Sequence, residues 1–217
     1  VDGVIYSDAV PDDHPIRQEV KKKQIPNWPY QVALGHFAAH YRTVAVTGTH
    51  GKSTTTAFLA HILINAGLDP NVLIGAPMQN TESPYARTGE SDLLIVEADE
   101  YRGHFLELSP SHAVVTSIDH DHPDAFSDLA DVENAFRLFL DRVASSGVVL
   151  TPRSVFDKHL VGNWPTQTQA IDIDTVLPPL VLPGRHMQHN AMLAIRMAGH
   201  LGVKQQESIH ALETFSG

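Results

Sequence analysis

A Gly-Lys-Ser triplet stands where a β-branched apolar stretch gives way to a helical pattern, within VAVTGTHGKSTTTAFLAHILINAG at residues 44–67. The apolar start predicts a buried strand. The spacing of apolar residues after it predicts a helix that ends near Ala66, with Gly67 as its left-handed cap. A glycine-containing turn between a strand and a helix gathers backbone N–H groups at the positive end of the helix, where polyphosphate binds well. The sequence therefore predicts a phosphate-binding loop, against the simpler interpretation of a turn that only connects two elements.

The loop departs from the usual spacing of a phosphate loop. That spacing, G-x-x-x-x-G-K-[ST], requires a glycine at position 46, but the chain has Val46 and its first glycine is Gly48. We therefore expect a loop that is shortened or differently wound. Lys52 is expected to reach the β- and γ-phosphates of a nucleotide, and a hydroxyl from the next two residues to bind Mg²⁺. The loop residues expected to bind the nucleotide are Gly48, Thr49, His50, Gly51, Lys52, Ser53 and Thr54.

Acidic residues follow the next strong strand pattern. The stretch LLIVEADE is apolar from Leu93 to Val96 and then carries Glu97, Asp99 and Glu100. Ligands of open α/β sheets gather at the carboxyl ends of parallel strands, and Mg²⁺ takes oxygen ligands. Glu97 is the first acid after the strand, so we expect it to bind the metal. The alternative is that these residues are solvated loop acids.

A second polar cluster, VVTSIDHDHPDAF, also follows a strand pattern. His120 and His122 form a His-x-His pair that could bind zinc, but zinc needs a third ligand and nothing selects one among the 14 histidines. Surface histidines in a His-rich chain are the simpler interpretation.

Composition limits the class of protein. The 217 residues are 42% hydrophobic and 18% charged, with a net charge of -10, which gives no indication of a nucleic-acid or membrane partner. The absence of cysteine excludes disulfides, thiolate metal sites and a cysteine nucleophile, and is compatible with the cytoplasm. No apolar run approaches the length of a membrane span and the N-terminus lacks a signal pattern, so we expect a cytoplasmic protein.

Strand patterns alternate with helix patterns from Arg42 onward. Apolar residues on both faces of such strands predict an α/β fold, a mostly parallel sheet with helices on both faces. The expected strands lie at 43–48, 92–99, 112–119, 147–152 and near 169–173, and the expected helices at 52–66, at 129–144 and as a pair from about residue 188.

The first part of the chain has a different character. Residues 1 to about 30 contain a short strand, a Pro- and Asp-rich turn, a basic helix through Lys21 to Lys23, and the start of another strand. This unit is too small to bury its own core, so we expect residues 1–30 to be the end of a preceding domain and residues 31–217 to form the central domain.

Four motifs in order, TGTHGKSTTT, EADE, DHPD and GRHMQHNAMLAI, resemble the central ATPase domain of the Mur ligases. These are ATP-dependent amide-forming enzymes of peptidoglycan precursor synthesis. The resemblance implies a P-loop ATPase-like central domain preceded by the end of a UDP-binding N-terminal domain. It also implies that the C-terminal domain of the family is absent from this sequence.

The resemblance implies a reaction and a set of roles. The chain is most similar to the alanine-adding branch, whose substrates are UDP-N-acetylmuramate, L-alanine and ATP, and whose reaction passes through an acyl phosphate. Catalytic roles are implied for Lys52, Glu97 and His122. One Mg²⁺ would be bound by Ser53 and Glu97, and a second metal ion by His122. His50 would face the sugar substrate, and His186 and Asn190 would lie near adenine.

Other functions remain open. The related ligase that attaches a whole tripeptide shares these motifs, a folylpolyglutamate synthase uses similar chemistry, and a non-catalytic nucleotide-binding module would also need the loop. The chain departs from the family pattern at three positions: Met187 and Ser117 each replace an asparagine, and Arg137 stands near the place of a carbamylated lysine.

Overall fold

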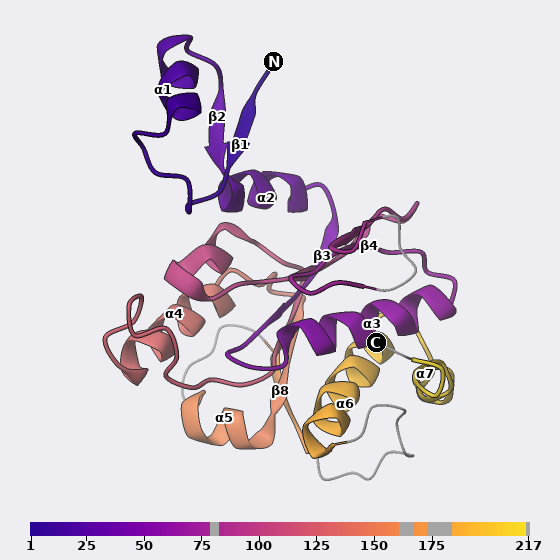
Figure 1. Cartoon of the computed structure of the whole chain (residues 1–217). Helices are drawn as coiled ribbons and strands as arrows, with labels where there is room; N and C mark the ends of the chain where they lie inside the picture. Colours follow the sequence, from indigo (N-terminus) through magenta and orange to yellow (C-terminus); the bar gives the residue numbers. More distant parts are fainter. Residues whose placement is uncertain (79–82, 161–166, 173–183, 216–217) are drawn as a thin grey trace.

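The computed structural model describes residues 1–78, 83–160, 167–172 and 184–215, and it contains two sheets (Figure 1). The smaller sheet pairs β1 (Val4–Tyr6) in parallel with β2 (Asn27–Pro29), and α1 (Pro15–Lys22) connects them. The basic helix and the short strand expected in this region are therefore confirmed. That residues 1–30 are the end of a UDP-binding domain stays a prediction.

The larger sheet has seven strands in the order β5-β4-β6-β3-β7-β8-β9. All neighbouring strands are parallel except β4 and β5, which are antiparallel. This confirms the expected α/β fold with a mostly parallel sheet. The strands are β3 (Arg42–Thr47), β4 (Asn71–Leu73), β5 (Ala86–Arg87), β6 (Leu93–Glu97), β7 (His112–Val115), β8 (Val148–Pro152) and β9 (Gln167–Ile171). The expected end of β9 at residue 173 lies outside the described residues.

Helices cover both faces of this sheet, as Figure 1 shows. One face packs against α3 (Lys52–Asn65), α6 (Arg185–His200) and α7 (Gln205–Leu212). The other face packs against α2 (Tyr30–Ala38), the 3-10 helix η1 (Tyr101–Glu107), α4 (Leu129–Leu140) and α5 (Arg153–His159). Successive side chains of β3 point to opposite faces, so Val44 and Val46 join the first core and Ala45 the second.

Two expectations about helices need correction. The helix expected to reach residue 144 ends at Leu140, because the chain turns so that the Ala144 N–H donates to the Pro110 carbonyl. The helix expected from about residue 188 begins earlier, at Arg185. The second strand expected within residues 1 to about 30 is β2, which is three residues long and leads directly into α2.

The position of β3 brings three loops together. β3 lies between β6 and β7, with Val46 opposite Glu97 and Thr47 opposite Val115. The loops that follow these three parallel strands therefore leave the same edge of the sheet side by side.

None of the helices in the described ranges combines the length and apolar character that a membrane span requires.

Candidate active site

The loop between β3 and α3 is built around two glycines with positive φ. Gly48 has φ +132°, and a Cβ there would overlap the Thr116 hydroxyl and lie 2.8 Å from the Ser117 nitrogen. Gly51 has φ +86° and caps α3, and a Cβ there would lie 2.8 Å from Asn190 Oδ1. Val46 is fully buried inside β3. The shortened spacing seen in the sequence therefore follows from a loop that begins at Gly48 rather than at position 46.

The loop is attached to the segment that follows β7. The Thr49 N–H donates to the Ser117 carbonyl (3.1 Å), and the His50 N–H donates to Ser117 Oγ (2.8 Å). Thr116 Oγ1 donates to the His50 carbonyl (2.6 Å). Thr49 Oγ1 donates to the Asp119 carbonyl and accepts from the Asp119 N–H. Ser117, which replaces the asparagine of the family pattern, thus bonds directly to the loop.

Lys52 is the first residue of α3 and points back over the loop. Its Nζ lies 2.8 Å from the Gly48 carbonyl oxygen and 2.8 and 2.9 Å from the two carboxylate oxygens of Glu100. The Glu100 side chain is only 2% exposed, whereas that of Lys52 is 15% exposed. Sequence reasoning did not assign a role to Glu100, although it belongs to the acidic cluster that follows β6.

Ser53 and Glu97, both expected to bind Mg²⁺, are in direct contact. Ser53 Oγ donates to Glu97 Oε1 at 2.9 Å, and the Gly75 N–H donates to Glu97 Oε2 at 2.7 Å. Thr54 is half-buried in the first turn of α3. The first-turn hydroxyl and the carboxylate at the end of β6 therefore form one polar pair beside the loop.

His122 approaches the same group of residues from the segment after β7. Its Nε2 lies 3.9 Å from Glu100 Oε1, and its ring packs edge-on against Tyr101, with centroids 5.2 Å apart. The Tyr101 hydroxyl donates to Asp124 at 2.6 Å, which raises the pKa of Tyr101 and lowers that of Asp124. His122 has φ +57°, which is uncommon for a residue with a side chain.

The geometry suits magnesium better than a metal held by protein ligands alone. Among the described residues, no group of three His, Asp or Glu side chains could hold a metal ion. His120, the other half of the possible zinc pair, directs its Nε2 to the Phe126 carbonyl. Mg²⁺ needs no such group, because it is commonly bound by one or two carboxylates together with phosphate oxygens and water. The contact between Ser53 and Glu97 fits that pattern.

A cavity of about 680 Å³ opens beside this site. Its lining includes Lys52 of α3, Glu97 of β6, Gln31 of α2 and Asp8 of the N-terminal unit. His104 of η1 connects the two units, because its Nε2 lies 3.0 Å from Asp8 Oδ2 and its Nδ1 lies 3.3 Å from Asp99 Oδ2. No motif in the sequence selects His104, which lies 96 residues from Asp8 along the chain.

The remaining predicted residues lie around the loop. Asn190 is buried against Gly51, so α6 packs directly on the loop. His186 is exposed in the first turn of α6, and Met187 packs against the core rather than pointing outward. His50 is exposed and is not among the residues that line the cavity. The predicted roles of His50, His186 and Asn190 toward ligands stay predictions.

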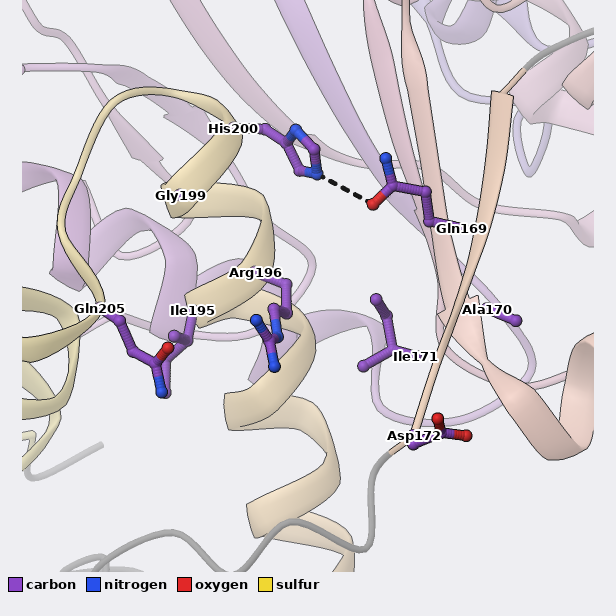
Figure 2. A pocket seen from close by; sticks show the side chains of 9 residues that line it. All are labelled: Gln169, Ala170, Ile171, Asp172, Ile195, Arg196, Gly199, His200 and Gln205. Atoms are coloured by element: carbon purple, nitrogen blue, oxygen red, sulfur yellow. Dashed lines mark hydrogen bonds between the residues drawn. The ribbon is translucent and has the colours of Figure 1, made fainter.

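A second cavity, of about 550 Å³, lies between α6 and β9 (Figure 2). Arg196 and His200 line it from α6, and His200 Nε2 lies 3.2 Å from Gln169 Oε1 of β9. It has no lining residue in common with the first cavity. We therefore centre the site on the loop and the cavity next to it.

The amino-acid sequence also matches a known protein family. The family model of the Mur ligase middle domain matches residues 46–177, which is more than half of the chain. The chain belongs to the Mur ligase family. The matched part of this Mur ligase chain includes the loop, the acidic cluster after β6 and the segment with His122.

Individual relatives carry ligase names. A UDP-N-acetylmuramate–L-alanine ligase of Solibacter usitatus is 36% identical over 99% of this chain and 52% of its own length. The crystal structure of the UDP-N-acetylmuramate:L-alanyl-gamma-D-glutamyl-meso-diaminopimelate ligase from Neisseria meningitidis matches with a TM-score of 0.86 and 25% identity, over 100% of this chain and 79% of that one.

A UDP-N-acetylmuramate-alanine ligase structure from Thermotoga maritima matches with a TM-score of 0.82 and 24% identity, over 100% of this chain and 55% of that one, and confirms the fold. The present chain spans about half the length of the curated relatives it matches.

Proposed function

We propose that this chain is the ATP-binding part of a ligase that adds L-alanine to UDP-N-acetylmuramate. The observation that carries the proposal is the convergence of Lys52 with the Ser53–Glu97 pair at the mouth of a large cavity. The relatives found by sequence similarity are named as L-alanine ligases, and these names support the choice of substrates.

The loop is suited to hold the phosphates of ATP. The N–H groups of the first turn of α3 have no partner within the helix, and they point toward the loop at the positive end of the helix. Thr49 and His50 donate their backbone N–H groups to Ser117, so these two N–H groups fix the shape of the loop. We assign Lys52 to the β- and γ-phosphates, because its ammonium lies beside this helix end.

Ser53 and Glu97 would hold Mg²⁺, and His122 would face a second metal ion near the transferred phosphate. When bound, the metal neutralises phosphate charge. The Ser53 hydroxyl and the Glu97 carboxylate are already fixed relative to each other at 2.9 Å, and the Gly75 N–H orients the second Glu97 oxygen. The protein therefore contributes alignment and fixed charge rather than a nucleophile.

The proposed reaction has two steps. The lactyl carboxylate of the sugar substrate attacks the γ-phosphorus of ATP, which gives an acyl phosphate and releases ADP. The amine of L-alanine then attacks the acyl carbon, and phosphate leaves as the amide forms, with loss of a proton from the amine. Both steps bring anions together, so Lys52 is placed where its charge favours them.

The cavity beside the loop is the proposed site of UDP-N-acetylmuramate. Its walls mix aromatic and polar side chains, including Tyr30, Gln31, Tyr85 and His104, which suits a sugar with hydroxyl groups. Residues 1–30 contribute part of this wall, in agreement with a role as the end of a UDP-binding domain. We place the reaction in the cytoplasm, where ATP and UDP-sugars are available, and assign no nucleic-acid partner.

The tripeptide-attaching ligase is the second candidate. It is favoured by the structural match to the Neisseria ligase, whose name includes a peptide that ends in meso-diaminopimelate. The two activities share the activated carboxylate and differ only in the amine that attacks it. The described geometry around the loop is therefore compatible with both.

An assay of phosphate release distinguishes the two ligase activities from each other and from a non-catalytic binding module. The natural protein that carries this chain should release phosphate from ATP only when UDP-N-acetylmuramate and L-alanine are both present. Release with the tripeptide but not with L-alanine would assign the second candidate. Nucleotide binding without any substrate-dependent release would identify a binding module and contradict the ligase proposal.

A further inference from the structure

Glu100 is a buried acid inside a site that is built for anions. Its side chain is 2% exposed, and both of its carboxylate oxygens face the phosphate loop. A buried carboxylate is costly unless it is paired, and Lys52 is the partner found here. The proposed function gives Glu100 no part in binding phosphate or metal.

The Lys52 ammonium has no free donor in this arrangement. An ammonium group carries three N–H bonds, and three oxygens surround Nζ within 2.9 Å: the Gly48 carbonyl and both oxygens of Glu100. A phosphate oxygen must therefore replace at least one of these contacts before Lys52 can bind it. Because Gly48 is fixed by the loop, the contacts that can be exchanged are those to Glu100.

We propose that Glu100 is a positioning residue that holds Lys52 over the loop and competes with nucleotide phosphate for its ammonium. The inference rests on the proposed function, because it requires phosphate to bind at Lys52. In the nucleotide-free protein Glu100 keeps the Lys52 side chain extended toward the site. When phosphate arrives, Lys52 exchanges Glu100 oxygens for phosphate oxygens.

A second possible partner of Glu100 lies close to it. His122 Nε2 lies 3.9 Å from Glu100 Oε1, beyond hydrogen-bond distance but close enough for a small movement to form one. The exchange at Lys52 thus links the phosphate loop to the segment after β7. Glu100 acts through Lys52 and His122, and no contact with substrate is assigned to it.

The test measures ADP binding without Mg²⁺, so that no metal ligand contributes. Glu100→Gln keeps the shape of the side chain and removes its charge, so ADP should bind about tenfold more tightly than to the unchanged chain. In a double-mutant cycle, Lys52→Met should weaken ADP binding more in the Glu100→Gln background than in the unchanged chain, because only there is the ammonium free of competition. Glu90→Gln, an exposed acid elsewhere, serves as the matched control with no change.

The outcomes are distinct. If the unchanged chain binds ADP but Glu100→Gln binds it equally or more weakly, the competition is disproved while the phosphate loop stands. If the unchanged chain does not bind ADP at all, the proposed function fails first. Should Glu100→Gln not fold, Glu100→Asp, which withdraws the carboxylate by one methylene, should bind ADP more tightly than the unchanged chain. Unchanged or weaker binding, or failure of both variants to fold, would show a structural role alone and overturn the proposal.

Discussion

Ser53 Oγ donates a hydrogen bond of 2.9 Å to Glu97 Oε1, although the two residues are 44 positions apart in the sequence. The first belongs to the first turn of α3 and the second to the end of β6. They meet because β6 pairs with β3 in parallel, and α3 begins directly after the β3 loop. A hydroxyl and a carboxylate are thereby fixed beside the position proposed for nucleotide phosphates.

Replacement of Glu97 should remove the benefit of Mg²⁺ for nucleotide binding. Glu97→Gln keeps the hydrogen bond from Ser53 but loses the charge that a divalent cation requires. We expect Mg²⁺ to strengthen ADP binding to the unchanged chain by about tenfold or more, and by less than about twofold for the variant. Calorimetric titrations with Mg²⁺ and with a chelator measure both ratios. An equal Mg²⁺ benefit in both proteins would remove Glu97 from the metal site.

Loss of the Lys52 ammonium should weaken nucleotide binding. Lys52→Met retains most of the apolar stem, so we expect ADP affinity to fall by at least about tenfold, which corresponds to ~1.4 kcal/mol. Lys158→Met, an exposed lysine of α5, is the matched control and should bind ADP normally. Unchanged affinity in Lys52→Met, measured by the same titration, would contradict the assignment of the loop.

Gly48 should not accept a side chain. A methyl group there would overlap the Thr116 hydroxyl, and φ +132° is strained for any residue with a Cβ. We expect Gly48→Ala to lower the free energy of unfolding by about 3 kcal/mol. Gly199→Ala is the control, because Gly199 lies in α6 with no atom within 4 Å of its added Cβ, and it should be neutral or stabilising by up to ~1 kcal/mol. Urea denaturation measures both, and equal effects would show that the close approach at Gly48 is unimportant.

His112 should make the protein less stable at acidic pH. Its Nδ1 accepts the Val148 N–H at 3.1 Å, and burial, followed by the charges of Arg42 and His200, lowers the pKa of His112 below its usual 6.5. The unfolded chain therefore binds a proton more readily than the folded one, so its contribution to stability is present above pH 6.5 and is lost as the pH falls toward the lowered pKa.

The free energy of unfolding of His112→Asn, measured between about pH 7.5 and pH 5, should decline less steeply than that of the unchanged chain, because the amide oxygen accepts the same N–H without titrating. The same slope in both proteins would exclude His112 as a source of the pH dependence.

The strand and loop that begin the central domain could be predicted because their signals are local. Apolar residues on both faces of 43–47 and the helical spacing after Lys52 depend only on neighbours in the sequence. The helix α2 was not predicted, because it is positioned by distant contacts: a Cβ at Gly35 would overlap the Glu107 carbonyl oxygen of η1. Close packing of this kind leaves no periodic pattern in the sequence.

Within the site, residue types could be predicted but not their pairing. Glu97 and Glu100 belong to one four-residue motif, EADE. The chain turns after it at Arg102 and Gly103, with φ of +51° and +73°, and no periodic pattern in the sequence predicts that turn. His104 shows the same limit, since its partners Asp8 and Gln31 come from parts of the chain brought near it only by the fold. Met187, which replaces an asparagine of the family pattern, packs against the core.

A crystal structure of the chain with Mg²⁺ and a non-hydrolysable ATP analogue tests the central claim most directly. We predict the β- and γ-phosphates within hydrogen-bond distance of Lys52 Nζ and the metal between Ser53 Oγ and Glu97. A nucleotide bound elsewhere, for example in the cavity between α6 and β9, with the loop unchanged and Lys52 still paired with Glu100, would contradict it.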